Sequence, residues 1–145
     1  MVPQGKLVVC INNATVTNAG TVTGRIDTLG FDYLTLDVFS TTSNDATNDP
    51  TVFKITEGDT TTAATAITAL EGDNASGWTI PNMETTTNTI WGVKFNIDLR
   101  GRKRYLKLWV SPLTSHTMSA VANLYRGEES PTTTTKAGVA ALVEV

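Results

Sequence analysis

The first residue to test for catalysis is His116, the single histidine of the chain, because imidazole commonly acts as a general base near neutral pH. It follows Ser115, but a serine nucleophile needs its base brought to it through space, which adjacency along the chain does not provide. The Gly-x-Ser-x-Gly motif is also missing. We therefore interpret His116 as a loop residue exposed to water. We expect a protein that is not an enzyme and has no catalytic residues.

Metal and cofactor motifs are equally sparse. One histidine and one cysteine, Cys10, cannot build a zinc site, and no glycine-rich phosphate loop is present. Cys10 lies in an apolar run, so we interpret it as a small buried hydrophobic residue. Asn and Asp cluster at 44–49 and 73–74, where their oxygens would suit Ca²⁺, but the EF-hand spacing is absent and such clusters are typical of turns. We expect no cofactor and no metal.

The strongest local charge feature is the basic run from Arg100 to Arg104, with Lys107 shortly after it. Three interpretations are open. The cations contact nucleic acid while nearby aromatic rings stack on bases, or they form a solvated hairpin tip that protects a sheet edge, or they pair with acidic groups of a neighbouring subunit. The net charge of −3 and the pI of about 5.0 make nucleic acid an unlikely partner. The candidate interface residues are Arg100, Arg102, Lys103, Arg104, Tyr105, Lys107 and Trp109.

Two segments with a period of two residues must position this basic run. In Tyr105–Val110, the leucines and Val110 alternate with Tyr105, Lys107 and Trp109, so the two sets face opposite sides of a strand. Trp91–Leu99 alternates in the same way. The short polar connection between them contains Gly101, which predicts a β-hairpin. On this hairpin Trp109 and Tyr105 would lie on an outer face, where exposed aromatic side chains often mark an interface.

Further strands are predicted by the same alternation. The segment from Thr60 to Leu70 is ambiguous, because its alanines have helical spacing while its threonines favour extended structure. We expect there a short helical turn or a loop with a short strand. The other predicted strands are Leu7–Ile11, Val22–Ile26, Tyr33–Phe39, Val52–Thr56, Met118–Tyr125 and, as an eighth candidate, Ala137–Val145.

Composition supports an all-β fold. The chain has 145 residues, 40% of them hydrophobic and only 17% charged, and threonine is abundant. Threonine favours the pleated, half-exposed surface of a sheet. We predict a single domain, 1–145, folded as a β-sandwich or jelly-roll-like barrel of about eight short strands with little or no helix. An N-terminal arm (1–6) and a C-terminal arm (131–145) are expected to extend from it.

No targeting segment is recognised in the sequence. The apolar run after Lys6 is shorter than the core of a signal peptide, and no apolar stretch approaches the length of a membrane span. We expect a protein made in a cytoplasm, with no membrane partner.

The order of short motifs resembles that of a known group of proteins. The chain resembles small β-sandwich structural proteins of tailed bacteriophages. The motifs that carry the resemblance are, in order, Asp27–Val38, Phe53–Asp59, Gly101–Leu108 and the late strand Ala120–Tyr125. The resemblance extends from Asp27 to Tyr125. It departs at Glu57-Gly58-Asp59, which is followed by threonine where the pattern has a second acid.

The resemblance implies a location in the virion and the role of a capsid decoration (cement) protein. Such a protein would bind the major capsid protein or another virion protein, as a homo-oligomer, with a trimer favoured. Two alternatives remain. One is a carbohydrate- or receptor-binding module that stacks sugars on outward tryptophans, including Trp78 and Trp91, and the other is a tail-tube or head–tail connector component.

Overall fold

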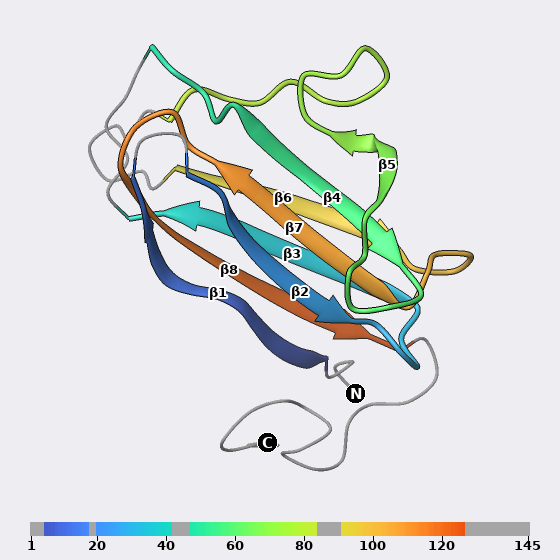
Figure 1. Ribbon diagram of the computed structural model, residues 1–145. Coiled ribbons are helices and arrows are strands. Elements are labelled where there is room, and N and C mark those ends of the chain that lie inside the picture. Colours follow the sequence, from blue (N-terminus) through green and yellow to red (C-terminus); the bar gives the residue numbers. More distant parts are fainter. Residues whose placement is uncertain (1–4, 18–19, 42–46, 84–90, 127–145) are drawn as a thin grey trace.

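The computed structural model describes residues 5–17, 20–41, 47–83 and 91–126 (Figure 1). They form eight strands in two four-stranded antiparallel sheets packed face to face. This confirms the predicted all-β sandwich. The strands are β1 (Lys6–Val16), β2 (Val22–Asp27), β3 (Tyr33–Ser40), β4 (Val52–Gly58), β5 (Thr65–Glu71), β6 (Trp91–Asp98), β7 (Tyr105–Ser111) and β8 (His116–Tyr125).

The strand order is that of a jelly roll. One sheet has the order β1-β8-β3-β6 and the other the order β2-β7-β4-β5. The first four strands thus pair with the last four in reverse sequence, β1 with β8, β2 with β7, β3 with β6 and β4 with β5. A chain folded back on itself in this way and then rolled up yields two sheets that enclose one core.

The predicted hairpin between Trp91–Leu99 and Tyr105–Val110 is wrong. β6 pairs with β3 in one sheet, whereas β7 lies between β2 and β4 in the other. The connection from residue 99 to residue 104 therefore crosses from sheet to sheet. Both strands turn an apolar stripe toward the same core from opposite sides, and the alternation along each strand looks the same in either arrangement.

The other strand predictions have separate outcomes. The two strands of that pair and the five strands predicted between Leu7 and Tyr125 are all present, and β1 is longer than predicted. The ambiguous segment 60–70 begins with a turn and continues as β5, without a helix. The eighth candidate, Ala137–Val145, lies outside the described residues, as do residues 1–4 and 131–145 of the predicted arms. Lys6 already belongs to β1.

The core lies between the two sheets and is lined by the inward positions of every strand. An aromatic cluster fills one side, where Phe53 contacts Trp78, Trp91 and Phe95 at ring-centroid separations of 5.0, 5.9 and 5.6 Å. Edge-to-face contacts at such separations stabilise cores beyond simple burial. The largest fully buried side chains are Phe53, Ile26, Leu34, Leu36, Ile55, Met83, Leu106, Leu108, Met118, Leu124, Val38 and Val110.

The side of the sandwich formed by β1 and β2 is closed by a close backbone approach. A Cβ atom added at Gly24 in β2 would lie 2.7 Å from the carbonyl oxygen of Cys10 in β1. Glycine is therefore required here by space, because any side chain would push the two edge strands apart.

Among the described residues, none forms a helix long and apolar enough to cross a membrane.

Candidate binding surface

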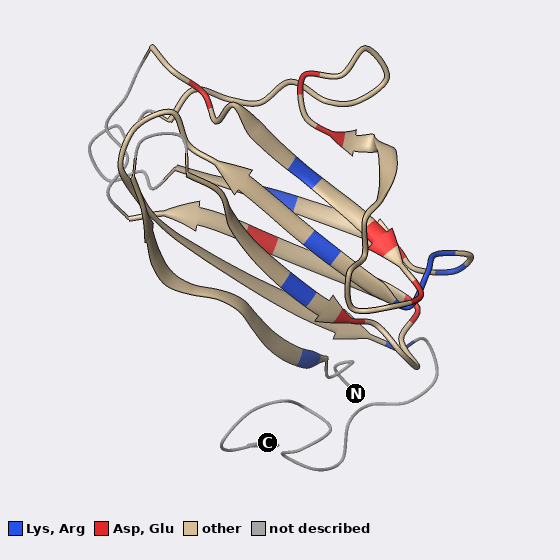
Figure 2. Ribbon diagram, viewed as in Figure 1, with Lys and Arg blue, Asp and Glu red and all other residues tan. Residues whose placement is uncertain are grey.

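The basic run occupies the connection between β6 and β7, at one end of the sandwich (Figure 2). Gly101 has a φ of 81°, and the N–H of Arg102 donates to the carbonyl of Leu99 at 2.9 Å, which closes a tight turn. Left-handed backbone of this kind favours glycine. Because the backbone turns here, the side chains of the run reach acids on β2, on β4, in the turn after β4 and at the end of β6.

Each cation of the run has an acidic partner within the same chain. Arg100 pairs with Asp98 at 2.6 Å, and Arg104 pairs with Asp27 at 2.8 Å. The remaining two pairs connect the run to the end of β4 and the turn after it: Arg102 with Glu57 at 3.9 Å and Lys103 with Asp59 at 3.2 Å.

The short pairs shift the protonation of their carboxylates. Hydrogen bonds from the Arg100 side chain and backbone lower the pKa of Asp98 to about 2. The side chain of Arg104 likewise lowers the pKa of Asp27, and the pKa values of both arginines are raised by their carboxylates. The positive charges of the run are thus largely neutralised by carboxylates of the same chain. This arrangement weakens the first sequence interpretation, in which these cations contact nucleic acid.

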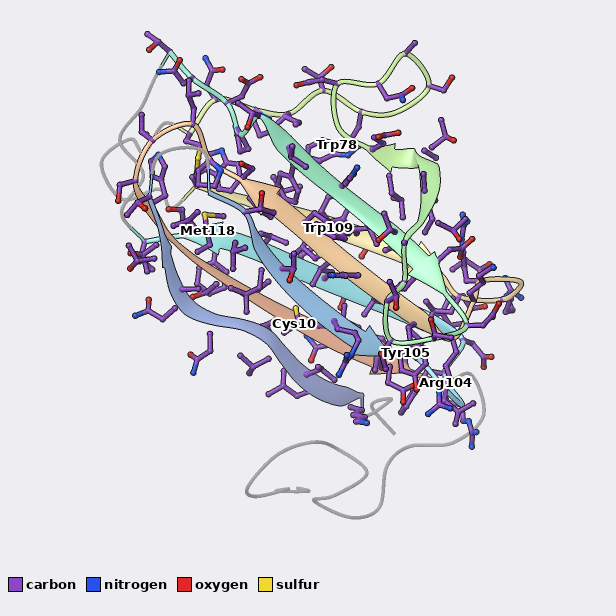
Figure 3. All side chains as sticks on the ribbon, viewed as in Figure 1. Cys10, Trp78, Arg104, Tyr105, Trp109 and Met118 are labelled. Atoms are coloured by element: carbon purple, nitrogen blue, oxygen red, sulfur yellow. The ribbon has the colours of Figure 1, made fainter. Side chains whose placement is uncertain are left out.

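The aromatic residues of β7 point to the outer face, as predicted, but their rings are covered in part by cations. The Arg104 guanidinium lies 4.8 Å from the centroid of Tyr105, and the Lys107 ammonium lies 4.0 Å from that of Trp109. Figure 3 labels Tyr105 and Trp109 on this strand and Arg104, which directly precedes it. Both aromatic residues are half-buried. Cation–π contacts of this kind stabilise the outer surface and reduce the ring area open to a ligand.

The polar edge of Trp109 is also satisfied. Its indole N–H donates to the hydroxyl of Thr56 at 2.8 Å, and the Thr56 hydroxyl donates to the carbonyl of Ala63. Thr56 is only 3% exposed, although it points to the outer side of β4, because the segment leading into β5 covers it. The hydrogen-bond chain therefore ties β7, β4 and the β4–β5 connection together.

The candidate interface residues consequently form two groups. Arg100, Arg102, Lys103 and Arg104 lie at the sandwich end and are paired with acids, and Tyr105 lies beside them in contact with Arg104. Lys107 and Trp109 lie further along β7, on its outer face.

Arg25 also belongs to this outer face and is not among the residues predicted from the sequence. Arg25 in β2 is the direct cross-strand partner of Lys107, and Thr23 is that of Trp109. The alternation of Val22–Ile26 already indicated that Arg25 faces outward. The sequence could not indicate which strand lies beside β2.

His116 is not a loop residue exposed to water. It begins β8, is 4% exposed, and its Nε2 lies 2.8 Å from the hydroxyl of Thr114. Successive side chains of a strand point to opposite faces, so His116 points inward like Met118 and Ala120, two and four residues after it.

Cys10 packs against the core, and burial raises the pKa of its thiol to about 11, as expected of a structural cysteine.

Asp73 and Asn74 of one Asn/Asp cluster stabilise a turn. Asp73 accepts the N–H of Ile80, and the Asn74 side chain accepts that of Ser76, which is the turn role expected of such residues. In the described ranges no three His, Cys, Asp or Glu side chains gather in a way that could hold a metal ion. Residues 44–46 of the other Asn/Asp cluster lie outside those ranges.

Two tryptophans proposed for sugar stacking belong to the interior. Trp91 is 4% exposed, and Trp78 is half-buried with its ring 5.0 Å from Phe53 and 5.3 Å from Phe95. Both therefore act as packing residues, Trp91 within the core and Trp78 partly buried against it.

Comparison with known proteins gives no family. No family model matches the chain, and no curated protein matches it. Among solved structures, one match is a family GH115 4-O-methyl-α-glucuronidase, BtGH115A, described as specific for decorated arabinogalactans. The identity is 15% and the TM-score 0.45, over 85% of this chain and 16% of the glucuronidase chain. The chain thus spans a small part of that enzyme.

Proposed function

We propose that this chain is a structural protein of a bacteriophage virion, a capsid decoration protein that binds and stabilises the outer capsid surface. Its partner would be the major capsid protein or another virion protein. The proposal is supported by the motif order between Asp27 and Tyr125 and by the jelly-roll fold, an architecture used by viral capsid domains among others. The fold alone does not specify the function.

The observation that carries the proposal is how the chain uses its charges. Acids from β2, from the end of β4 and from the turn after β4 are each paired with a cation of the 100–104 connection. Such pairs tie the 100–104 connection to β2, to β4 and to the turn after β4, all on the sheet that contains β7, and they do not converge into a reactive site. A rigid framework with few charged residues suits a static, assembled protein better than one that acts on a substrate.

The proposal includes a homotrimer. Head-to-tail contacts around a threefold axis close on themselves, so a trimer is a natural form for a protein that sits at capsid symmetry axes. The predicted terminal arms would contribute to such contacts.

Light scattering and co-sedimentation test the proposal together. We expect a solution mass near three times 15.5 kDa and co-sedimentation with tailed-phage capsid shells purified without their decoration protein. A monomer that does not bind shells would contradict the proposal. Open rings or tubes would point instead to a tail-tube or connector component, and sugar binding lost on Trp109→Ala to a carbohydrate-binding module.

A further inference from the structure

Two cations lie directly opposite each other on the outer face of the β2–β7 pair. Arg25 in β2 and Lys107 in β7 are register partners, so their side chains leave the sheet side by side on the same face. Arg25 is exposed and Lys107 is half-buried. Figure 2 shows basic positions following one another across β2, β7 and β4.

This pair differs from most of the other basic residues that the structure describes. Six ion pairs hold Lys54, Lys94 and the four cations of the 100–104 connection. Within the described ranges, neither Arg25 nor Lys107 is paired with a carboxylate. Like charges directly opposite in an antiparallel sheet destabilise it. The fold therefore tolerates an unfavourable contact here, and a ligand that brings negative charge would relieve it.

The side chains that flank Arg25 and Lys107 would border such a ligand. Trp109 lies two residues further along β7 on the same face, with Thr23 opposite it on β2 and Lys54 opposite it on β4. The Lys107 ammonium is held 4.0 Å from the Trp109 ring, which orients it without neutralising it. The outer face of β2 and β7 therefore carries two adjacent cations, Arg25 and Lys107, beside the half-buried ring of Trp109.

We propose that this face, centred on Arg25 and Lys107, is a docking surface for an acidic protein surface, whose carboxylates pair with the two cations. The inference rests on the proposed function and deepens it, because it assigns the face that would meet the capsid. A nucleic acid is the poorer match, since its affinity depends on many phosphate contacts along a basic track. Here the cations are two, and the chain carries a net charge of −3.

The test uses hexaglutamate as a soluble probe and amide chemical shifts as the readout. We expect the largest shifts at Thr23, Arg25, Lys107 and Trp109, with binding that weakens as salt is raised. Arg25→Gln and Lys107→Gln should each weaken binding by on the order of threefold, and the double variant by about tenfold, as expected for partly exposed ion pairs. Lys94→Gln, on the opposite sheet, removes one charge equally and should leave binding unchanged.

Stability separates a binding role from a structural one. Arg25→Gln should keep or raise the unfolding midpoint, because it removes a like-charge contact. A residue needed only for folding would lower it. Shifts confined to the 100–104 connection, equal binding by the double variant, or stronger binding of a DNA oligonucleotide or of heparin to this face would overturn the assignment.

Capsid shells then distinguish the two proposals. If the wild-type chain binds shells and the double variant binds them equally well, the docking face is wrong while the decoration function stands. If the wild type does not bind shells but binds hexaglutamate through Arg25 and Lys107, the decoration function is wrong and the acidic docking face stands.

Discussion

Arg104 donates two hydrogen bonds to the carboxylate of Asp27, from Nε to Oδ1 at 2.9 Å and from Nη2 to Oδ2 at 2.8 Å. The pair joins the end of β2 to the residue that precedes β7. Two parallel bonds between a guanidinium and a carboxylate restrict both side chains more than a single contact does. Together with the Arg100–Asp98 pair, it makes this end of the sandwich dependent on ionised carboxylates.

The first prediction is that acid destabilises the fold through these carboxylates. The pKa of Asp27 is lowered in the folded chain, and that of Asp98 is lowered to about 2. As the pH falls from about 4 toward 2, these two carboxylates take up protons in the unfolded state before they do so in the folded state. The stability that their ionised forms give the fold above pH ~4 is therefore lost across that range. Urea unfolding midpoints measured from pH 7 to pH 2.5 check this.

The matched control for the acid effect is Asp27→Asn with Arg104→Gln. The double variant removes the titrating group and its partner, so its stability should fall less steeply between pH ~4 and ~2 than that of the wild type. Asp59→Asn should leave the wild-type profile nearly intact, because its ion pair with Lys103 is more exposed. An identical slope in all variants would contradict the role assigned to Asp27.

The second prediction concerns the hydroxyl of Thr56, which accepts from Trp109 and donates to Ala63. Thr56→Val keeps the side-chain shape but leaves both partners without this bond. Because Thr56 is 3% exposed, we expect a loss of about 1–3 kcal/mol in the free energy of unfolding. Thr56→Ser, which retains the hydroxyl, should lose less. Denaturant unfolding followed by tryptophan fluorescence measures both, and equal losses would show that the hydroxyl does not matter.

The third prediction is a difference between two glycine positions. Gly24→Ala would place Cβ 2.7 Å from the Cys10 carbonyl oxygen, so β1 and β2 must separate. We expect a destabilisation of about 1–3 kcal/mol, as for overpacked cores. At Gly92 the nearest atoms lie at 3.5 and 3.6 Å, an ordinary contact, and Gly92→Ala should be neutral or mildly stabilising. Thermal unfolding of the two variants provides the comparison.

The alternation of apolar residues was enough to predict the fold class and most strands, because each strand shows one face to the core. It could not predict the sheet to which a strand belongs. Val93–Leu99 and Leu106–Val110 carry the same pattern whether they pair with each other or face each other across the core. The hairpin prediction failed because the pairing is decided by contacts far apart in sequence.

The candidate surface was predicted only in part for the same reason. The basic run is visible in the sequence, but its acidic partners come from β2, from β4 and from the turn after β4. Conversely, Arg25 appears unremarkable in sequence and becomes significant only beside Lys107. His116 was misplaced because Ser111 to Ser115 resembles a loop and gives no sign of where β8 begins.

The fourth prediction is that the Cys10 thiol reacts slowly in the folded protein. Burial raises its pKa to about 11, and its Sγ donates to the carbonyl of Ala120 at 3.3 Å. The thiolate is the reactive form, so little of it exists at pH 8. Ellman's reagent should therefore label the native chain at least tenfold more slowly than the urea-unfolded chain, whose thiol has a pKa of about 8.5. Equal rates would mean that β1 opens readily from β8, and the Gly24→Ala variant, in which β1 is displaced, should react faster than the wild type.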